Sequence, residues 1–227
     1  MTAPPGQVRY GTAEGRWILV ATIVGSGIAS LDATVVNVAL PTIGRHFGAG
    51  VSGLQWVITA YLITLAALIL LGGSLGDLFG RKRIFTIGVV WFSLASLFCG
   101  IAVNLPMLIA ARALQGIGGA LLVPGSLALI EASFAVSDRG RAIGAWSGLG
   151  GITAAIGPFV GGWLVSAVSW RLIFLLNLPL AVVVLVASRH VPESTDPQAV
   201  RQIDVAGAAL VVIGLATTTY ALIEGPG

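Results

Sequence analysis

Long apolar runs recur along the whole chain, and they constrain its fold more than any other feature. We count seven, at about residues 17–39, 54–75, 84–103, 107–130, 142–168, 172–188 and 205–223. Each is close to the roughly 20 residues that an α-helix needs to cross the hydrocarbon core of a bilayer. The runs therefore predict an all-α integral membrane protein.

Composition and charge exclude several other classes of protein. Hydrophobic residues make up 56% of the chain and charged residues only 9%, whereas about a quarter of a soluble domain is charged. The net charge of +3 is small, and the basic residues fall in loops between apolar runs, so we expect no nucleic-acid partner. Cys99 lies inside an apolar run, while His46 and His190 lie in different loops. These positions predict no disulfide, no metal site and no cofactor.

The placement of arginine and lysine sets the expected orientation. With a cytoplasmic N-terminus, nine of the twelve basic residues fall in inner segments, two in outer loops and one, Arg112, within a span. Excess positive charge marks the cytoplasmic side, so we expect a multi-pass protein of the cell (inner or plasma) membrane. The expected units are a mobile cytoplasmic tail (1–16), a six-helix bundle (17–188), a cytoplasmic linker (189–204), and a seventh helix with a truncated outer loop (205–227).

Two charged residues inside the apolar runs are candidates for function. Asp32 lies roughly 22 Å along the first helix and Arg112 roughly 8 Å from the outer end of the fourth, so both fall at a similar depth. Charged groups within a bilayer usually face the bundle interior, pair, and mark ion or substrate paths. We therefore expect Asp32 to pair with Arg112, directly or through water, with Gln115 on the same helical face. The alternatives are a structural acid at Asp32 and an Arg112 that snorkels to the outer interface.

The stretch GSLGDLFGRKR, residues 73–83, joins the second and third apolar runs. We expect Gly76 and Gly80 to permit a sharp reversal of the chain. We expect Asp77 to accept hydrogen bonds from free backbone N–H groups at a nearby helix start. The sequence Arg-Lys-Arg at 81–83 is the densest positive cluster in the chain. A plain positively charged turn would share this charge, but the order of residues is far more restrictive.

The fifth apolar run carries GLGGITAAIGPFVGG, residues 148–162. Gly157 and Gly161 are one helical turn apart, with Gly162 beside them, and Pro158 removes one backbone donor. The pattern predicts a kinked helix with a smooth face that can pack and slide against a neighbour. Simple structural packing of small residues is the alternative.

The first six runs form two sets of three, which suggests a 3+3 inverted repeat. Asp32 and Arg112 then occupy the first helix of each set.

Several of these segments resemble motifs of one family, the major facilitator superfamily. GSLGDLFGRKR is similar to its signature loop between the second and third helices. LDATVVNVALP, ARALQGIGGA, GPFVGG and WRLIFLLNLP resemble segments of its drug:proton antiporter branch with fourteen spans. The resemblance implies the six-helix N-terminal bundle of the major facilitator fold plus one further transmembrane helix. A complete member has about twice this length, so the chain is expected to be an N-terminal half that lacks a C-terminal bundle, or an incomplete copy.

The resemblance also implies a function, which is proton-coupled efflux of amphipathic or cationic compounds by alternating access. Small molecules, protons and the lipid bilayer are then the partners. Asp32 becomes a proton or cation-substrate site, Arg112 modulates its protonation, and Gln115 joins them. The bending of the helix with Gly157, Pro158, Gly161 and Gly162 is associated with antiport. By the same resemblance, the inner gate consists of residues of the signature loop, namely Gly73, Asp77, Gly80, Arg81, Lys82 and Arg83.

Other functions compete with this interpretation. An intramembrane enzyme would need a paired acid, a Ser–His arrangement or metal ligands within the spans, so we expect no enzyme. A retinal-type protein would need a lysine in its last helix, whereas the only lysine is Lys82, in a loop. A channel, a structural assembly protein, an exporter of a metabolite or amino acid, and a non-functional transporter fragment stay open.

Overall fold

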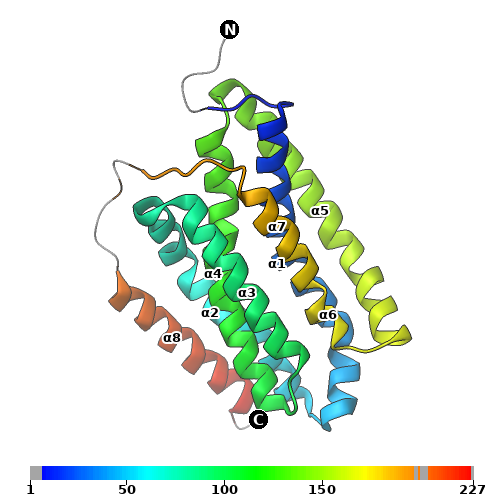
Figure 1. The fold of residues 1–227 in the computed structure, drawn as a ribbon. Coiled ribbons are helices and arrows are strands. Elements are labelled where there is room, and N and C mark those ends of the chain that lie inside the picture. Colours follow the sequence, from blue (N-terminus) through cyan, green and yellow to red (C-terminus); the bar gives the residue numbers. More distant parts are fainter. Residues whose placement is uncertain (1–6, 197–198, 200–203, 226–227) are drawn as a thin grey trace.

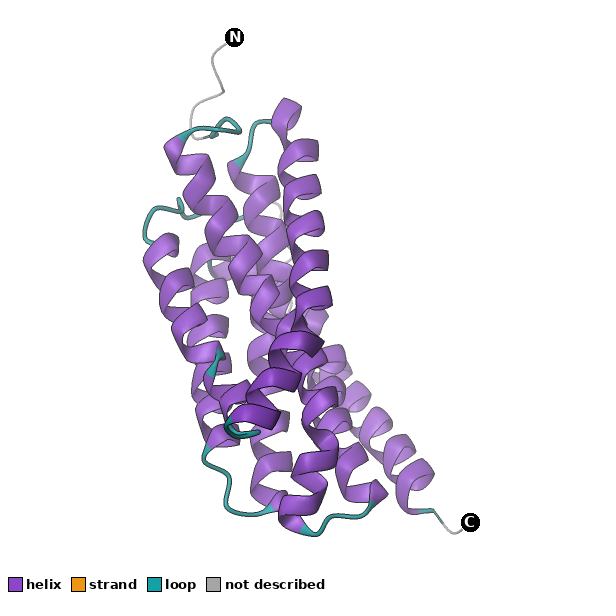
Figure 2. Cartoon of the chain, turned by 90° about the vertical axis from the view of Figure 1, so that its right-hand side faces the viewer, coloured by secondary structure: helices purple, strands orange, loops and turns teal. Residues whose placement is uncertain are grey.

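The computed structural model describes residues 7–196, 199 and 204–225, and almost all of them are helical. The helices are α1 (Ala13–Phe47), α2 (Val51–Phe79), α3 (Arg81–Gly100), α4 (Leu105–Ser133), α5 (Val136–Ala167), α6 (Leu172–Leu175), α7 (Asn177–Ser188) and α8 (Val205–Glu224). Six of these are long and apolar enough to cross a membrane, and Leu172–Ser188 is a shorter apolar segment. The predicted all-α architecture is confirmed, and the helices run side by side as a bundle (Figures 1 and 2).

Helix α4 lies at the centre of the bundle and packs most closely against α2 and α3. Small residues on α4 allow this approach. A Cβ atom added at Gly118 would lie 2.6 Å from the backbone nitrogen of Phe92 on α3. Gly116 faces the α2 backbone at Tyr61 in the same way. These glycines therefore let α2 and α3 pack closely against α4.

Proline has different effects in two of the apolar runs. Helix α1 continues through Pro41 to Phe47, where Gly48 ends it with φ 62°. Pro41 removes only one backbone hydrogen bond, and the next turns of α1 re-form beyond it. The run 172–188 is instead divided at Leu176 into α6 and α7. Pro179 has no N–H to donate to the Leu175 carbonyl, four residues earlier, and its ring crowds that carbonyl.

The expected loop at 73–83 is almost wholly helical, which corrects the prediction. Helix α2 continues to Phe79 and α3 begins at Arg81, so Gly80 alone joins them. Gly80 has φ 109°, a conformation that only glycine adopts readily. Gly76 is an ordinary helical residue of α2 and does not contribute to the reversal.

The described part of the N-terminal tail is bound to the bundle, although a mobile tail was expected. The Val8 N–H donates to the Ser133 carbonyl at 2.7 Å, and the Ala135 N–H donates to the Val8 carbonyl at 3.1 Å. The Tyr10 N–H donates to Asp138 Oδ2 at 2.9 Å. These contacts hold residues 7–12 against the connection between α4 and α5. Residues 1–6, and residues 197–198 and 200–203 of the expected linker, lie outside the described residues.

Helix α8 lies at the edge of the bundle, where it packs on α2 (Figure 1). None of its described residues is buried. Its C-terminal end is held by Glu224, which accepts hydrogen bonds from Trp56 Nε1 at 3.2 Å and from the Ser52 hydroxyl. The ring of Tyr220 lies 6.4 Å from that of Trp56. The final residues of the expected outer loop, 226–227, are not among those described.

Candidate functional site

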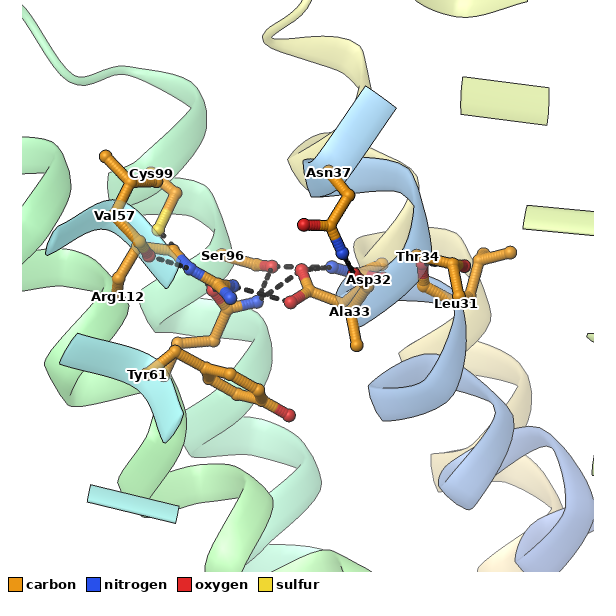
Figure 3. A network of polar contacts seen from close by, with 12 residues as sticks. Leu31, Asp32, Ala33, Thr34, Asn37, Val57, Tyr61, Ser96, Cys99 and Arg112 are labelled. Atoms are coloured by element: carbon orange, nitrogen blue, oxygen red, sulfur yellow. Dashed lines mark hydrogen bonds and ion pairs between the residues drawn. The ribbon is translucent and has the colours of Figure 1, made fainter. Parts of the chain in front are cut away.

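Four helices place five polar side chains at one buried point of the bundle, the polar centre. Asp32 comes from α1, Ser96 from α3, Arg112 and Gln115 from α4, and Asn177 from α7, and all five are buried. Arg112 is the largest fully buried side chain among the described residues. Figure 3 shows Arg112 and Asp32 pointing toward one another between their helices.

The carboxylate of Asp32 accepts hydrogen bonds on both of its oxygens. Arg112 Nη1 donates to Oδ2 at 2.5 Å, and the two side chains are 1% and 0% exposed. On the other oxygen, Oδ1, the Gln115 amide donates at 2.9 Å and the Asn177 amide at 3.2 Å. The acid is therefore paired and fully hydrogen bonded, as a charged group away from water must be.

The guanidinium of Arg112 is held from several directions. Its Nε donates to the Val57 carbonyl at 3.1 Å and its Nη1 donates to Gln115 Oε1 at 2.6 Å. Its central carbon lies 4.2 Å from the centre of the Tyr61 ring, within the range of a cation–π interaction. The side chain thus points into the bundle, which rules out snorkelling to the outer interface.

Sequence reasoning missed two members of this centre, Ser96 and Asn177. Ser96 Oγ accepts hydrogen bonds from the Gln115 and Asn177 amides, both at 2.8 Å. Asn177 stands alone as a polar residue in the apolar segment LIFLLNLPL, two residues before Pro179. Polar residues in such segments commonly form hydrogen bonds between helices, and that signal could have identified it.

At the connection between α2 and α3, Asp77 does not cap a helix as expected but pairs with Arg81. The two side chains lie four residues apart across Gly80, with Arg81 Nη2 2.7 Å from Asp77 Oδ1. The free N–H groups at the start of α3 bind Glu193 of the linker instead. Lys82 N donates to Glu193 Oε1 at 3.0 Å and Arg83 N to Oε2 at 3.1 Å.

The absence of a side chain at Gly80 makes room for Glu193. A Cβ atom there would lie 2.8 Å from Glu193 Cδ. The segment carrying Glu193 is held further by two backbone hydrogen bonds, from Arg81 N to the Ser194 carbonyl and from Asp196 N to the Asp77 carbonyl. Gly73, the remaining member of the expected gate, lies within α2 and faces Pro124 of α4.

The glycines of α5 pack against α1 next to Asp32. Gly157 faces Thr34, and a Cβ atom at Gly161 would lie 3.0 Å from Val35 Cβ. Gly162 faces Val38 at 3.9 Å, and α5 passes through Pro158 without a break in the helix. These residues therefore set the distance between α5 and α1 but do not contact the polar centre.

Comparisons with known proteins agree on one family. The family model "Major Facilitator Superfamily" matches residues 22–223. The chain is 41% identical to "Multidrug resistance protein Stp" of Mycobacterium tuberculosis (strain CDC 1551 / Oshkosh), covering 92% of this chain and 39% of that protein. It is 38% identical to "Methylenomycin A resistance protein" of Bacillus subtilis (strain 168), covering 97% and 48%. It is 41% identical to "Probable actinorhodin transporter" of Streptomyces coelicolor (strain ATCC BAA-471 / A3(2) / M145), covering 99% and 42%.

The chain therefore spans less than half the length of these relatives. Among solved structures, peptide transporter POT in complex with sulfate matches with a TM-score of 0.69 at 17% identity. That match covers 98% of this chain and 49% of the transporter. At this identity the likeness shows a shared fold and nothing about substrate.

Proposed function

We propose, because the chain belongs to the major facilitator superfamily, that it forms the N-terminal half of a proton-coupled drug efflux transporter of the cell membrane. In this proposal the N-terminus is cytoplasmic, and a C-terminal bundle supplies the other half of the central cavity. The names of the relatives support drug export. The observation that carries proton coupling is the single carboxylate of Asp32, buried at the centre of the bundle and surrounded by donors.

The geometry supports exchange of a proton for a substrate at Asp32. The charged carboxylate holds Arg112 through Nη1. A proton on Asp32 would weaken that contact by removing the negative charge, and a cationic compound would replace it. Arg112 would keep its bonds to the Val57 carbonyl and to Gln115. Because one carboxylate cannot hold both at once, uptake of a proton favours release of a cationic substrate. We assign this coupling to Asp32, Arg112 and Gln115.

The other two candidate regions would serve the conformational change. In the proposal, the signature residues at the cytoplasmic face form an inner gate that contains the Asp77–Arg81 pair. Gly157 and Gly161, packed on Thr34 and Val35 of α1, let α5 move relative to the helix that carries Asp32. The first region lies on α2 and α3, which pack against α4, and the second lies on α5, which packs against α1. Helices α4 and α1 carry Arg112 and Asp32.

Efflux of a cationic dye driven by a pH gradient tests the proposal. The complete gene product is reconstituted in vesicles and compared with Asp32→Asn, which keeps the shape of the side chain and removes its charge. Asp32→Asn should insert normally and lose gradient-driven efflux. Glu14→Gln is the matched control, because Glu14 is an exposed acid on the same helix. Parental efflux with the same pH dependence in Asp32→Asn would make Asp32 a structural acid. Single-channel currents without exchange would instead identify a channel.

A further inference from the structure

The side-chain amide of Asn177 is placed to change its hydrogen bonding when Asp32 changes its charge. We propose that this amide reverses on protonation of Asp32, so that Asn177 donates to the charged carboxylate and accepts from the protonated carboxyl. Asn177 is thus a positioning residue for the proton. The inference rests on the proposed function, because it requires that Asp32 takes up a proton.

The first step concerns which oxygen of Asp32 receives the proton. A charged carboxylate only accepts hydrogen bonds, whereas a protonated carboxyl must also donate one. Oδ2 faces Arg112, and a guanidinium has no acceptor. A proton on Oδ2 would therefore point at another donor. The proton belongs on Oδ1, which faces the amides of Gln115 and Asn177.

Gln115 cannot turn to accept this proton. Its Oε1 accepts a hydrogen bond from Arg112 Nη1 at 2.6 Å and lies 3.5 Å from the Cys99 thiol sulfur. Reversal of the Gln115 amide would direct its NH₂ group at the guanidinium, so that two donors would face one another. Arg112 therefore fixes Gln115 as a donor toward Asp32 in both charge states.

Asn177 carries no such restraint. Its Nδ2 donates to Asp32 Oδ1 and to Ser96 Oγ, while its buried Oδ1 has no hydrogen-bond partner in the described part of the chain. The two ends of an amide have nearly the same shape, so the group can reverse in place. After reversal, Oδ1 would face the protonated Asp32 and the hydroxyl of Ser96, both of which can donate.

The position of Asn177 in the fold fits this role. It is the first residue of α7, directly after the interruption at Leu176. The titratable and charged groups near Asp32 are Tyr61 on α2, Cys99 on α3 and Arg112 on α4. Each of these groups lies on a helix other than α7. The charge of Asp32 acts on Asn177 through the hydrogen bond from Asn177 Nδ2 to Asp32 Oδ1.

Infrared difference spectroscopy of the complete gene product tests the inference. Acidification should produce a carboxylic-acid C=O band that Asp32→Asn removes, which assigns it to Asp32. Asn177→Leu has a similar size and no hydrogen-bonding group, so the carboxyl loses its acceptor and the band should move to higher frequency. Asn177→Val serves the same purpose if the leucine variant does not fold. Ser96→Ala is the control, since it removes the other partner of Asn177 and leaves the three hydrogen bonds that Asp32 accepts from Arg112, Gln115 and Asn177.

The outcomes separate the inference from the proposed function. A band that moves in Asn177→Leu and stays near the parental frequency in Ser96→Ala supports the reversal. A band that stays in place in Asn177→Leu overturns it and leaves proton uptake by Asp32 intact. Equal shifts in both variants would mean that any disturbance of the network moves the band, which also overturns it. A parent without an Asp32 band at any pH would refute proton uptake and the inference together.

Discussion

Separating the buried ion pair of Asp32 and Arg112 should show strong energetic coupling. Arg112→Met keeps an apolar stem of similar length, and Asp32→Asn keeps the shape of the acid. Removing one partner of a buried pair typically costs about 3–5 kcal/mol, because the other charge is left uncompensated. Asp32 would keep the Gln115 and Asn177 donors, and Arg112 would keep the Val57 carbonyl. We therefore expect each single variant to lose about 3 kcal/mol, the lower end of that range.

The double variant is the informative one, because it contains neither charge. Independent effects would add to about 6 kcal/mol, whereas we expect a total of about 3–4 kcal/mol and hence a coupling energy of about 2–3 kcal/mol. The free energy of unfolding is measured on the chain in detergent micelles with a denaturant, followed by tryptophan fluorescence.

A matched surface pair provides the control for this cycle. Asp77 and Arg81 also form an ion pair, but their side chains are 36% and 20% exposed. Exposed pairs typically contribute about 0.2–1 kcal/mol, so the cycle of Asp77→Asn with Arg81→Met should give coupling in that range. If the Asp32 and Arg112 variants were additive within about 0.5 kcal/mol, the buried contact would carry no net energy and the reasoning would be wrong.

Two further predictions concern the expected orientation and the connection between α2 and α3. In a Cys99→Ala background, a membrane-impermeant thiol reagent added from outside should leave Lys82→Cys unlabelled and should label Ala49→Cys in the short connection between α1 and α2; labelling of Lys82→Cys would reverse the assigned orientation. Glu193→Ala should lower the free energy of unfolding by about 1 kcal/mol, the usual loss for a helix N-cap, because it frees the Lys82 and Arg83 N–H groups. The exposed acid Glu131 is the control, and equal losses in Glu193→Ala and Glu131→Ala would show that the cap is not the cause.

The depth of the central pair could be predicted because helical rise is constant. Counting residues from the ends of two apolar runs placed Asp32 and Arg112 at one level, and the structure shows them in contact. Their roles in transport remain predictions. Asn177 could not be placed in the same way, because depth alone does not say which helices are neighbours. That information is in the packing of α7 against α1 and α3.

The connection between α2 and α3 was predicted less well, for a different physical reason. Glycines and charges at 73–83 indicate a turn, yet one residue with φ 109° completes it. Capping is usually local in sequence, so the sequence predicts a helix-capping acid next to the turn, at Asp77. The group that satisfies the α3 N–H groups is Glu193, more than a hundred residues away. A contact of that range depends on where α7 ends, which hydrophobic periodicity does not specify.

Two ion pairs among the described residues are suited to opposite tasks. Asp77 and Arg81 are partly exposed and lie on either side of Gly80, so water can replace each partner and separation costs little. A movement of α2 relative to α3 can therefore break this contact without any ligand. Asp32 and Arg112 are enclosed, and their separation leaves two charges without solvent. In the proposed cycle, that contact opens when a proton or another cation neutralises Asp32. Opening of the Asp32–Arg112 pair would therefore control when the transporter changes conformation. The Asp77–Arg81 pair would break as a result of that change.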